Sequence, residues 1–125
     1  MEGSPQELEI YQLAHALGVE IHHLSLQLPK FELYESGSQV RRAAKSISAN
    51  IVEGYGRRCY KADFIRFLIY AHASCDETIE WLTYLRDCHQ NLQDVICPML
   101  DKADILGRKL NRFIRGVESN HRSAK

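Results

Sequence analysis

Apolar residues recur every three or four positions along four separate stretches of this chain, which is the spacing of one face of an α-helix. The first stripe spans residues 5–28 and stops at Pro29, whose ring cannot continue a helix. The other predicted helices span residues 36–54, 61–90 and 95–117. Four helices joined by short connections predict an all-α fold, an antiparallel up-and-down four-helix bundle that residues 1–125 form as a single domain.

Local signals predict where three of these helices begin or end. Ser4 is a candidate N-cap, with Pro5 suited to the first helical turn. Gly54 and Gly56 flank a tyrosine where the second stripe stops, which predicts a helix C-terminus that turns through left-handed backbone. Pro98 fits the last helix because it is expected in the first turn.

Two segments are more apolar than a single helix face requires. The connector at residues 30–38 contains Phe31 and Tyr34, so we expect it to fold back over one end of the core. The predicted helix at residues 61–90 is apolar over more than half of its circumference. It is therefore either central to the bundle or buried on a second side by another subunit.

Charge and cysteine content narrow the class of protein. Sixteen basic and sixteen acidic residues cancel, so a nucleic acid or an anionic membrane could be bound only by a local patch. No apolar run approaches the roughly 20 residues of a membrane span, and the first residues do not resemble a signal segment. We therefore expect a cytoplasmic protein without a membrane partner. The four cysteines have no CxxC spacing and are expected to be free thiols.

Polar residues follow helical spacing beside two of the apolar stripes. Ser46, Asn50 and Glu53 share one face of the second helix. A matching face of the third helix carries Tyr70, Ser74, Glu77 and Trp81. If the two faces meet, their carboxylates could form a pair for acid–base chemistry or metal binding, or the residues could form a structural network. We favour the structural network, which with the helix stop at Gly54 includes Ser46, Asn50, Glu53, Ser74 and Glu77.

No other pattern predicts a metal, a cofactor or a catalytic site. Cys88, His89 and Cys97 give three candidate zinc ligands around one turn, but a fourth is missing. The histidines predict no metal site, and we expect no catalytic arrangement of a nucleophile, a base and an orienting group. The Gly-Tyr-Gly break lacks the Gly-Lys-Ser/Thr ending of a phosphate loop. We therefore expect a protein that is not an enzyme.

Basic residues flank this polar stretch on both sides. The candidate nucleic-acid contacts are Arg41, Arg42, Lys45, Arg57, Arg58 and Lys61. Guanidinium groups interleaved with Tyr55 and Tyr60 suit phosphate contacts and base stacking. The alternative is a solvated surface whose cations pair with acids of the same subunit. Oligomerisation would favour binding, because copies of a modest patch around a rotation axis add up to a ring of positive charge.

The chain resembles the bacterial ribosomal-RNA intervening-sequence proteins, also called S23-type proteins. The resemblance rests on QVRRAAKSI at residues 39–47, ANIVEGYGRR at residues 49–58 and FIRFL at residues 64–68, and extends over nearly the whole chain. It implies a non-enzymatic four-helix bundle that assembles as a homopentamer. A related branch is the accessory protein of diversity-generating retroelements, which binds nucleic acid and a reverse transcriptase.

By position, the resemblance implies basic contacts at Arg41, Arg42, Arg57 and Arg58, and a bundle-stabilising role for Asn50, Glu53 and Glu77. Our first hypothesis is accordingly a cytoplasmic, homopentameric accessory protein that binds RNA or DNA and partners a nucleic-acid enzyme. The second is a protein-interaction scaffold that binds no nucleic acid. A structure in which the arginines are bonded within the subunit would favour the second.

Overall fold

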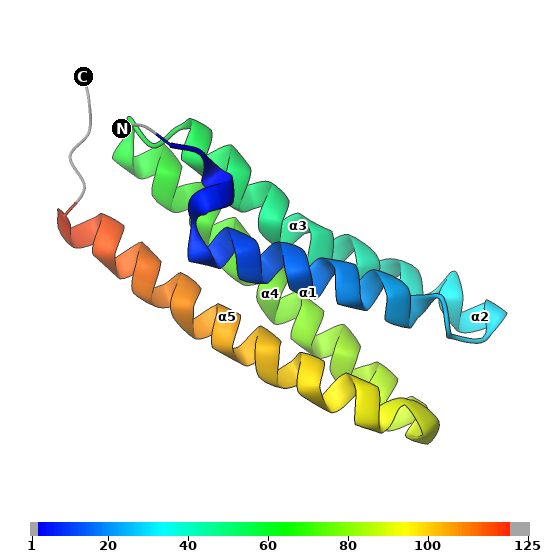
Figure 1. Cartoon of the computed structure of the whole chain (residues 1–125). Helices are drawn as coiled ribbons and strands as arrows, with labels where there is room; N and C mark the ends of the chain where they lie inside the picture. The colour runs from blue at the N-terminus through cyan, green and yellow to red at the C-terminus, as the bar shows by residue number, and fades with distance from the viewer. Residues whose placement is uncertain (1–2, 121–125) are drawn as a thin grey trace.

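The computed structural model describes residues 3–120, in which four long helices lie side by side (Figure 1). They are α1 (Glu9–Ser25), α3 (Ser36–Gly56), α4 (Lys61–Cys88) and α5 (Gln93–Asn120). The short helix α2 (Lys30–Leu33) and two 3-10 turns, η1 (Pro5–Glu7) and η2 (Gln90–Leu92), lie in the connections. No strand occurs among the described residues, so the all-α prediction is confirmed.

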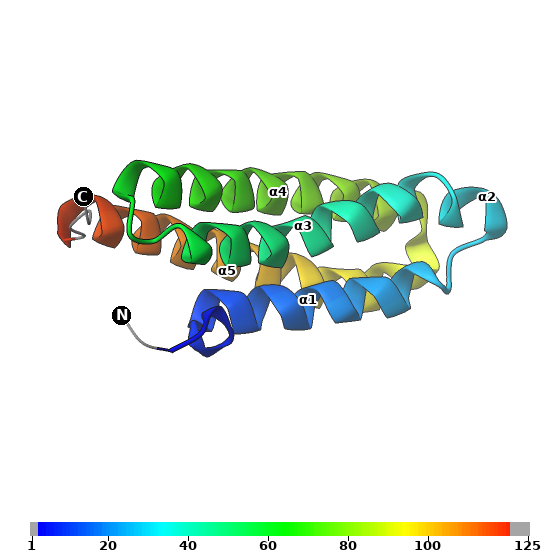
Figure 2. The same cartoon turned by 90° about the horizontal axis from the view of Figure 1, so that it is seen from above.

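The long helices form a closed ring of neighbours. Helix α3 packs between α1 and α4, and α5 packs against the other sides of the same two helices. Consequently α1 lies diagonally across from α4, and α3 across from α5. Figure 2, a view at right angles to the first, shows the connections alternating between the two ends of the bundle. The predicted antiparallel up-and-down bundle is confirmed.

The predicted apolar stripes come together as one core. Each long helix contributes large side chains that are less than 2% exposed, among them Ile21, Leu24, Ile47, Ile51, Leu68, Leu82, Leu85, Ile96, Leu106 and Leu110. Small residues of α3 and α4, namely Ala44 and Ala71, are fully buried as well. None of the helices within residues 3–120 is long and apolar enough to cross a bilayer.

The chain starts differently from the prediction of one helix over residues 5–28. Pro5 opens the separate turn η1, and Leu8 then adopts extended backbone with ψ of 134° before α1 begins. Ser4 precedes η1, but its side chain makes no capping hydrogen bond. Helix α1 ends at Ser25, three residues before the predicted end, because the following residues already turn towards Pro29.

The break at Gly54 and Gly56 is not left-handed, which corrects the prediction. Helix α3 continues through both glycines to Gly56, and the only positive φ among the described residues belongs to Gly3. Gly54 is buried where α4 comes close: a Cβ there would lie 3.1 Å from Phe67 Cβ and 3.3 Å from the Phe64 carbonyl oxygen. Gly54 therefore lets two helices approach, and the chain turns only at Arg57.

The last helix also begins earlier than predicted. Turn η2 leads directly into α5 at Gln93, so Pro98 is the sixth residue of the helix and lies in its second turn. The prediction of Pro98 in the first turn is wrong by one turn. Proline there removes the hydrogen bond to the carbonyl four residues earlier, a loss confined to the start of a helix of 28 residues.

The connector closes one end of the bundle, but its aromatic side chains are exposed and a charged one is buried, contrary to the prediction. Helix α2 caps that end (Figure 1), yet Phe31 and Tyr34 are 69% and 70% exposed. Glu32 is buried instead, and its carboxylate accepts a hydrogen bond of 2.8 Å from His89 Nε2, just after α4. A charge-assisted hydrogen bond thus joins the connector to the other side of the bundle.

Candidate functional surfaces

Arg41 holds three segments together from inside the subunit. Its Nη1 donates to Ser25 Oγ at 3.0 Å, and its Nη2 donates to the Leu33 carbonyl oxygen at 3.3 Å. Ser25 is fully buried and in turn donates to the His22 carbonyl oxygen at 2.8 Å. The guanidinium therefore fixes the end of α1 and the connector onto α3, so Arg41 is committed to the fold.

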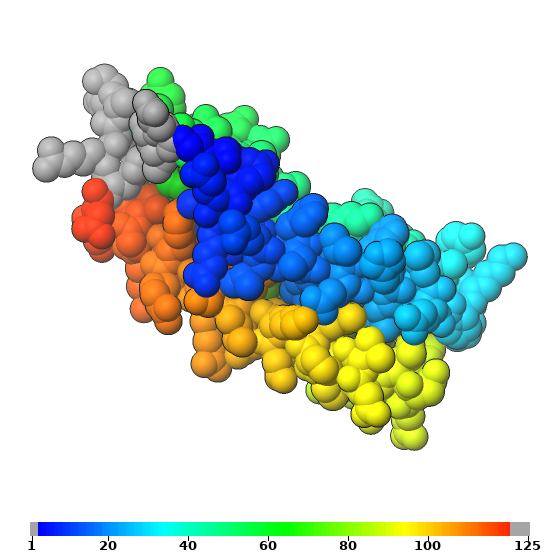
Figure 3. Space-filling model, in the orientation of Figure 1, coloured from blue at the N-terminus to red at the C-terminus, as the bar shows by residue number. Residues whose placement is uncertain are grey.

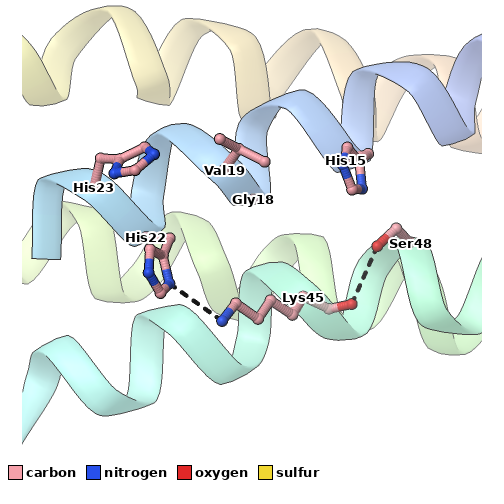
Figure 4. Close-up of a pocket in the computed structure, with 7 residues that line it drawn as sticks. All are labelled: His15, Gly18, Val19, His22, His23, Lys45 and Ser48. Carbon is pink, nitrogen blue, oxygen red and sulfur yellow. Dashed lines mark hydrogen bonds between the residues drawn. The ribbon is translucent and has the colours of Figure 1, made fainter.

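Lys45 borders a hollow of about 420 Å³ between α1 and α3. The residues that line it are His15, Gly18, Val19, His22, His23, Lys45 and Ser48 (Figure 4). Lys45 Nζ donates to His22 Nδ1 at 3.2 Å. The Lys45 charge, followed by burial and the charges of His23 and Arg41, lowers the pKa of His22 below 6.5. The lowered pKa favours a neutral His22 imidazole that accepts a hydrogen bond from the Lys45 ammonium.

Arg57 and Arg58 lie at the opposite end of α3 and stack on aromatic rings. Arg57 forms an ion pair of 2.7 Å with Glu53, and its guanidinium lies 4.6 Å from the centre of the Phe67 ring. Arg58 lies 4.1 Å from the centre of the Tyr55 ring and donates to the Tyr55 carbonyl oxygen at 2.9 Å. Both residues therefore strengthen the turn between α3 and α4, while Lys61 is half-buried where α4 begins.

Arg42 differs from the other arginines of the central motif. It is exposed and makes no hydrogen bond or ion pair with any residue from 3 to 120. Its position is fifteen residues before Arg57, which is about 22 Å along a helix. The six candidate contacts are thus spread over the α1 side of α3, its outer side and its far end. The structure does not gather them into one surface.

The polar faces of α3 and α4, whose meeting the spacing left open, are joined by the hydroxyls of Ser46 and Ser74. Ser74 Oγ donates to Ser46 Oγ at 3.0 Å, and Asn50 Nδ2 donates to the same hydroxyl at 3.0 Å. The carboxylates have separate partners: Glu53 pairs with Arg57, and Glu77 accepts from Trp81 Nε1 at 3.1 Å. This is the geometry of a structural network.

An open groove runs along the outside of α3 and α4 over this network. Its floor is polar and is lined by Gln39, Arg42, Ala43, Ser46, Ser74 and Glu77. On α4, two aromatic pairs lie on either side of Ser74 and Glu77 along the chain: Phe67 with Tyr70 and Trp81 with Tyr84, whose ring centres are 5.6 Å and 6.0 Å apart. We call these four residues the aromatic row. Tyr70 and Tyr84 are exposed within the subunit.

The cysteines and histidines do not converge. Cys59, Cys88 and Cys97 are exposed free thiols, and His89 is engaged by Glu32. No group of three potential metal ligands is found within residues 3–120. Cys75 is buried, its Sγ donates to the Ala103 carbonyl oxygen, and burial, with the charges of Asp76 and Asp104, raises its pKa to about 12.

Two features escaped the sequence analysis. The first is the Glu32–His89 pair, whose members are 57 residues apart and belong to no motif. The second is a cationic face on α5, where Arg108, Arg112 and Arg115 follow one another at i, i+4 and i+7. That spacing was readable in the sequence, since residues 105–117 contain four basic residues and no acidic one.

Comparisons with known proteins agree with this architecture. The family model described as "23S rRNA-intervening sequence protein" matches residues 6–112. The crystal structure of a protein with unknown function from the S23 ribosomal protein family of Bacteroides thetaiotaomicron VPI-5482 superposes with a TM-score of 0.77. The two sequences are 23% identical, and the alignment covers 85% of this chain and 95% of that one. No curated protein sequence matches the chain.

Proposed function

This chain belongs to the 23S rRNA-intervening sequence protein family, and from that premise we propose that it acts as a non-enzymatic, self-associating scaffold. The observation that carries the proposal is the aromatic row beside the α3–α4 groove. Tyrosine and tryptophan are enriched in protein interfaces because they bury a large apolar area and keep a polar group for hydrogen bonding. The assembly is proposed to be the cytoplasmic homopentamer that the family resemblance implies.

The placement of the basic residues supports a scaffold. Arg41 is bonded to Ser25 and Leu33, Arg57 is paired with Glu53, and Lys45 donates to His22. Much of the positive charge of the central motif thus serves contacts within the subunit. The network between α3 and α4 also supports a non-enzymatic role, because the serine hydroxyls bond to each other and to Asn50 rather than to a base.

Light scattering on the purified full chain tests this assembly. Subunits of 14.4 kDa would give about 72 kDa for a pentamer, five times that mass. The double variant Tyr70→Ala, Tyr84→Ala should lower the mass towards that of one subunit. The matched control is Phe31→Ala, Tyr34→Ala, which removes two aromatic side chains of the connector that are more exposed than Tyr70 and Tyr84, and it should leave the mass unchanged.

A mass of 14.4 kDa for the unmodified chain at micromolar and higher concentrations would refute self-association. An oligomer that loses mass with the connector variant and keeps it with the α4 variant would place the assembly surface elsewhere. Circular dichroism of each variant shows that the helices are retained.

A second candidate function is nucleic-acid binding by the assembled protein, and the exposed, unpaired state of Arg42 within the described residues favours it. Each copy in an oligomer would add its own cations, and binding to phosphates grows with the number engaged. Retention of a structured RNA by the unmodified chain should fall steeply as the salt concentration rises. Absence of binding by the unmodified chain at low salt would end this candidate.

A further inference from the structure

The C-terminal half of α5 carries four basic residues and no acidic residue between positions 108 and 115. Arg108, Arg112 and Arg115 share one face because they are spaced by four and three residues. Together with Asn111 they line a shallow hollow of about 380 Å³ on the outside of the helix. This half of α5 forms an open flank of the molecule, drawn in orange beside α1 (Figure 3).

These cations are more available than Arg41 and Lys45 of α3, which are hydrogen-bonded within the subunit. Within residues 3–120, Arg112 and Arg115 make no hydrogen bond or ion pair. Arg108 pairs with Asp104 at 3.1 Å, but its side chain is 77% exposed, and such surface pairs are weak and exchange readily with solvent. The fourth basic residue of this segment, Lys109, lies on the neighbouring side of the helix and forms an ion pair with Glu9.

We propose that this α5 face, formed by Arg108, Asn111, Arg112 and Arg115, binds the phosphate backbone of a nucleic acid. From Arg108 to Arg115 the helix rises about 10 Å, so the three guanidinium groups form an extended cationic strip that can contact successive phosphates of one strand. Arginine forks bind phosphate oxygens through two parallel hydrogen bonds, and the Asn111 amide adds a further donor. The inference rests on the second candidate function above, nucleic-acid binding, and places the binding site on α5 instead of on the basic residues of α3.

The charge and burial of α5 favour a nucleic acid over a lipid surface. A helix that binds a membrane must insert its apolar face, and the apolar face of α5, including Leu106, Leu110 and Ile114, is buried in the core. The α5 face also points away from the α3–α4 groove, because α5 lies diagonally across the bundle from α3. The aromatic row of a subunit therefore lies on a different side of the bundle from its α5 face.

Fluorescence anisotropy with a labelled 20-base-pair DNA duplex, titrated at several salt concentrations, tests the site. In the full chain, Arg108→Gln, Arg112→Gln, Arg115→Gln should weaken binding at least about ten-fold at low salt and reduce the salt slope by about 2.7, or 0.9 for each lost phosphate contact. The matched control removes three arginines elsewhere, Arg42→Gln, Arg57→Gln, Arg58→Gln, and should keep the slope.

Each alternative result decides the matter. Failure of the unmodified chain to bind at low salt overturns the nucleic-acid candidate together with this site. Binding that survives in the α5 variant and is lost in the control overturns this site alone. Equal displacement of the duplex by polyglutamate of matched charge points to an acidic protein instead and also overturns it. If the triple variant changes mass or helix content, Arg112→Gln and Arg115→Gln are measured singly, each with an expected slope change of about 0.9.

Discussion

Replacing His89 with alanine tests how firmly the connector is fastened to the bundle. His89 and Glu32 join residues 57 apart through a bond of 2.8 Å, and their side chains are only 13% and 9% exposed. A hydrogen bond to a charged group contributes about 1.5–3 kcal/mol. Glu32 keeps its hydrogen bonds from Ser36 in the variant, so the loss should stay below the roughly 3–5 kcal/mol of a fully orphaned charge. We expect about 2–3 kcal/mol.

Urea denaturation followed by circular dichroism at pH 7 measures this difference, at one protein concentration because oligomers gain stability with concentration. The control is Lys102→Ala, which breaks a similar cross-bundle pair with Glu20 whose side chains are 54% and 36% exposed. That pair should contribute no more than about 1 kcal/mol. An unchanged m-value shows that both variants unfold from the same compact state.

The pH dependence gives a second check. Burial alone raises the pKa of Glu32, but hydrogen bonds from His89 and Ser36 outweigh it, and the pKa lies below 4.5. The stabilisation is therefore complete above pH 4.5 and is lost as the pH falls through the lowered pKa. The difference between the unmodified chain and His89→Ala should shrink in that acidic range. A loss no larger than that of Lys102→Ala, or one that is constant down to pH 3, would refute the reasoning.

Three further predictions follow from contacts described above. Gly54→Ala should destabilise the protein by about 1–3 kcal/mol, because the added Cβ would meet Phe67 Cβ and the Phe64 carbonyl oxygen. The control Gly116→Ala has open space around the new Cβ and should stabilise the protein by up to about 1 kcal/mol through helix propensity. Equal effects of the two variants in urea denaturation would show that the helices do not touch at Gly54. Arg41→Lys should cost about 1–2 kcal/mol, because an ammonium cannot reach Ser25 and Leu33 in the arginine's fork geometry, and a melting temperature equal to that of the unmodified chain would contradict this role. At pH 8, a thiol reagent should modify Cys59, Cys88 and Cys97 quickly and Cys75 only as fast as the core opens, because burial raises the Cys75 pKa to about 12; rapid labelling of four thiols per native chain would disprove it.

The sequence predicts this fold well because each long helix buries a stripe that is visible as three- and four-residue spacing. Residues such as Ile47, Leu68 and Leu110 could be assigned to the core without knowing their neighbours. The prediction for the connector was wrong about which side chains are buried: Phe31 and Tyr34 are exposed, and Glu32 is buried. Glu32 is buried only because His89, distant in sequence, receives it, and no local pattern records that partner.

For the candidate sites, too, local spacing could be read from the sequence, whereas contacts between distant residues could not. Spacing placed Ser46 and Ser74 on the polar face of their own helices, because helix geometry determines which residues share a face, and the structure shows that these two faces meet. It could not tell that Arg41 is bonded inside the subunit while Arg42, its neighbour, is exposed. Adjacent helical residues point about 100° apart, so one charged pair in the sequence serves two surfaces. The cationic α5 face needed no distant partner, and periodicity alone would have identified it.

The bond between Ser46 and Ser74 sets the register of α3 against α4. A seam of small residues such as Ala43 and Ala71 offers little to stop one helix from sliding along the other by a turn, about 5.4 Å. Such a slip would separate the Ser74 hydroxyl from Ser46 and break the hydrogen bond that joins the two helices, whereas the Asn50–Ser46 bond lies within α3 and would remain. The Ser46–Ser74 hydrogen bond therefore contributes to the specificity of the fold more than to its stability. It adds little to the free energy of unfolding, but it disfavours bundles in which α3 and α4 are paired out of register.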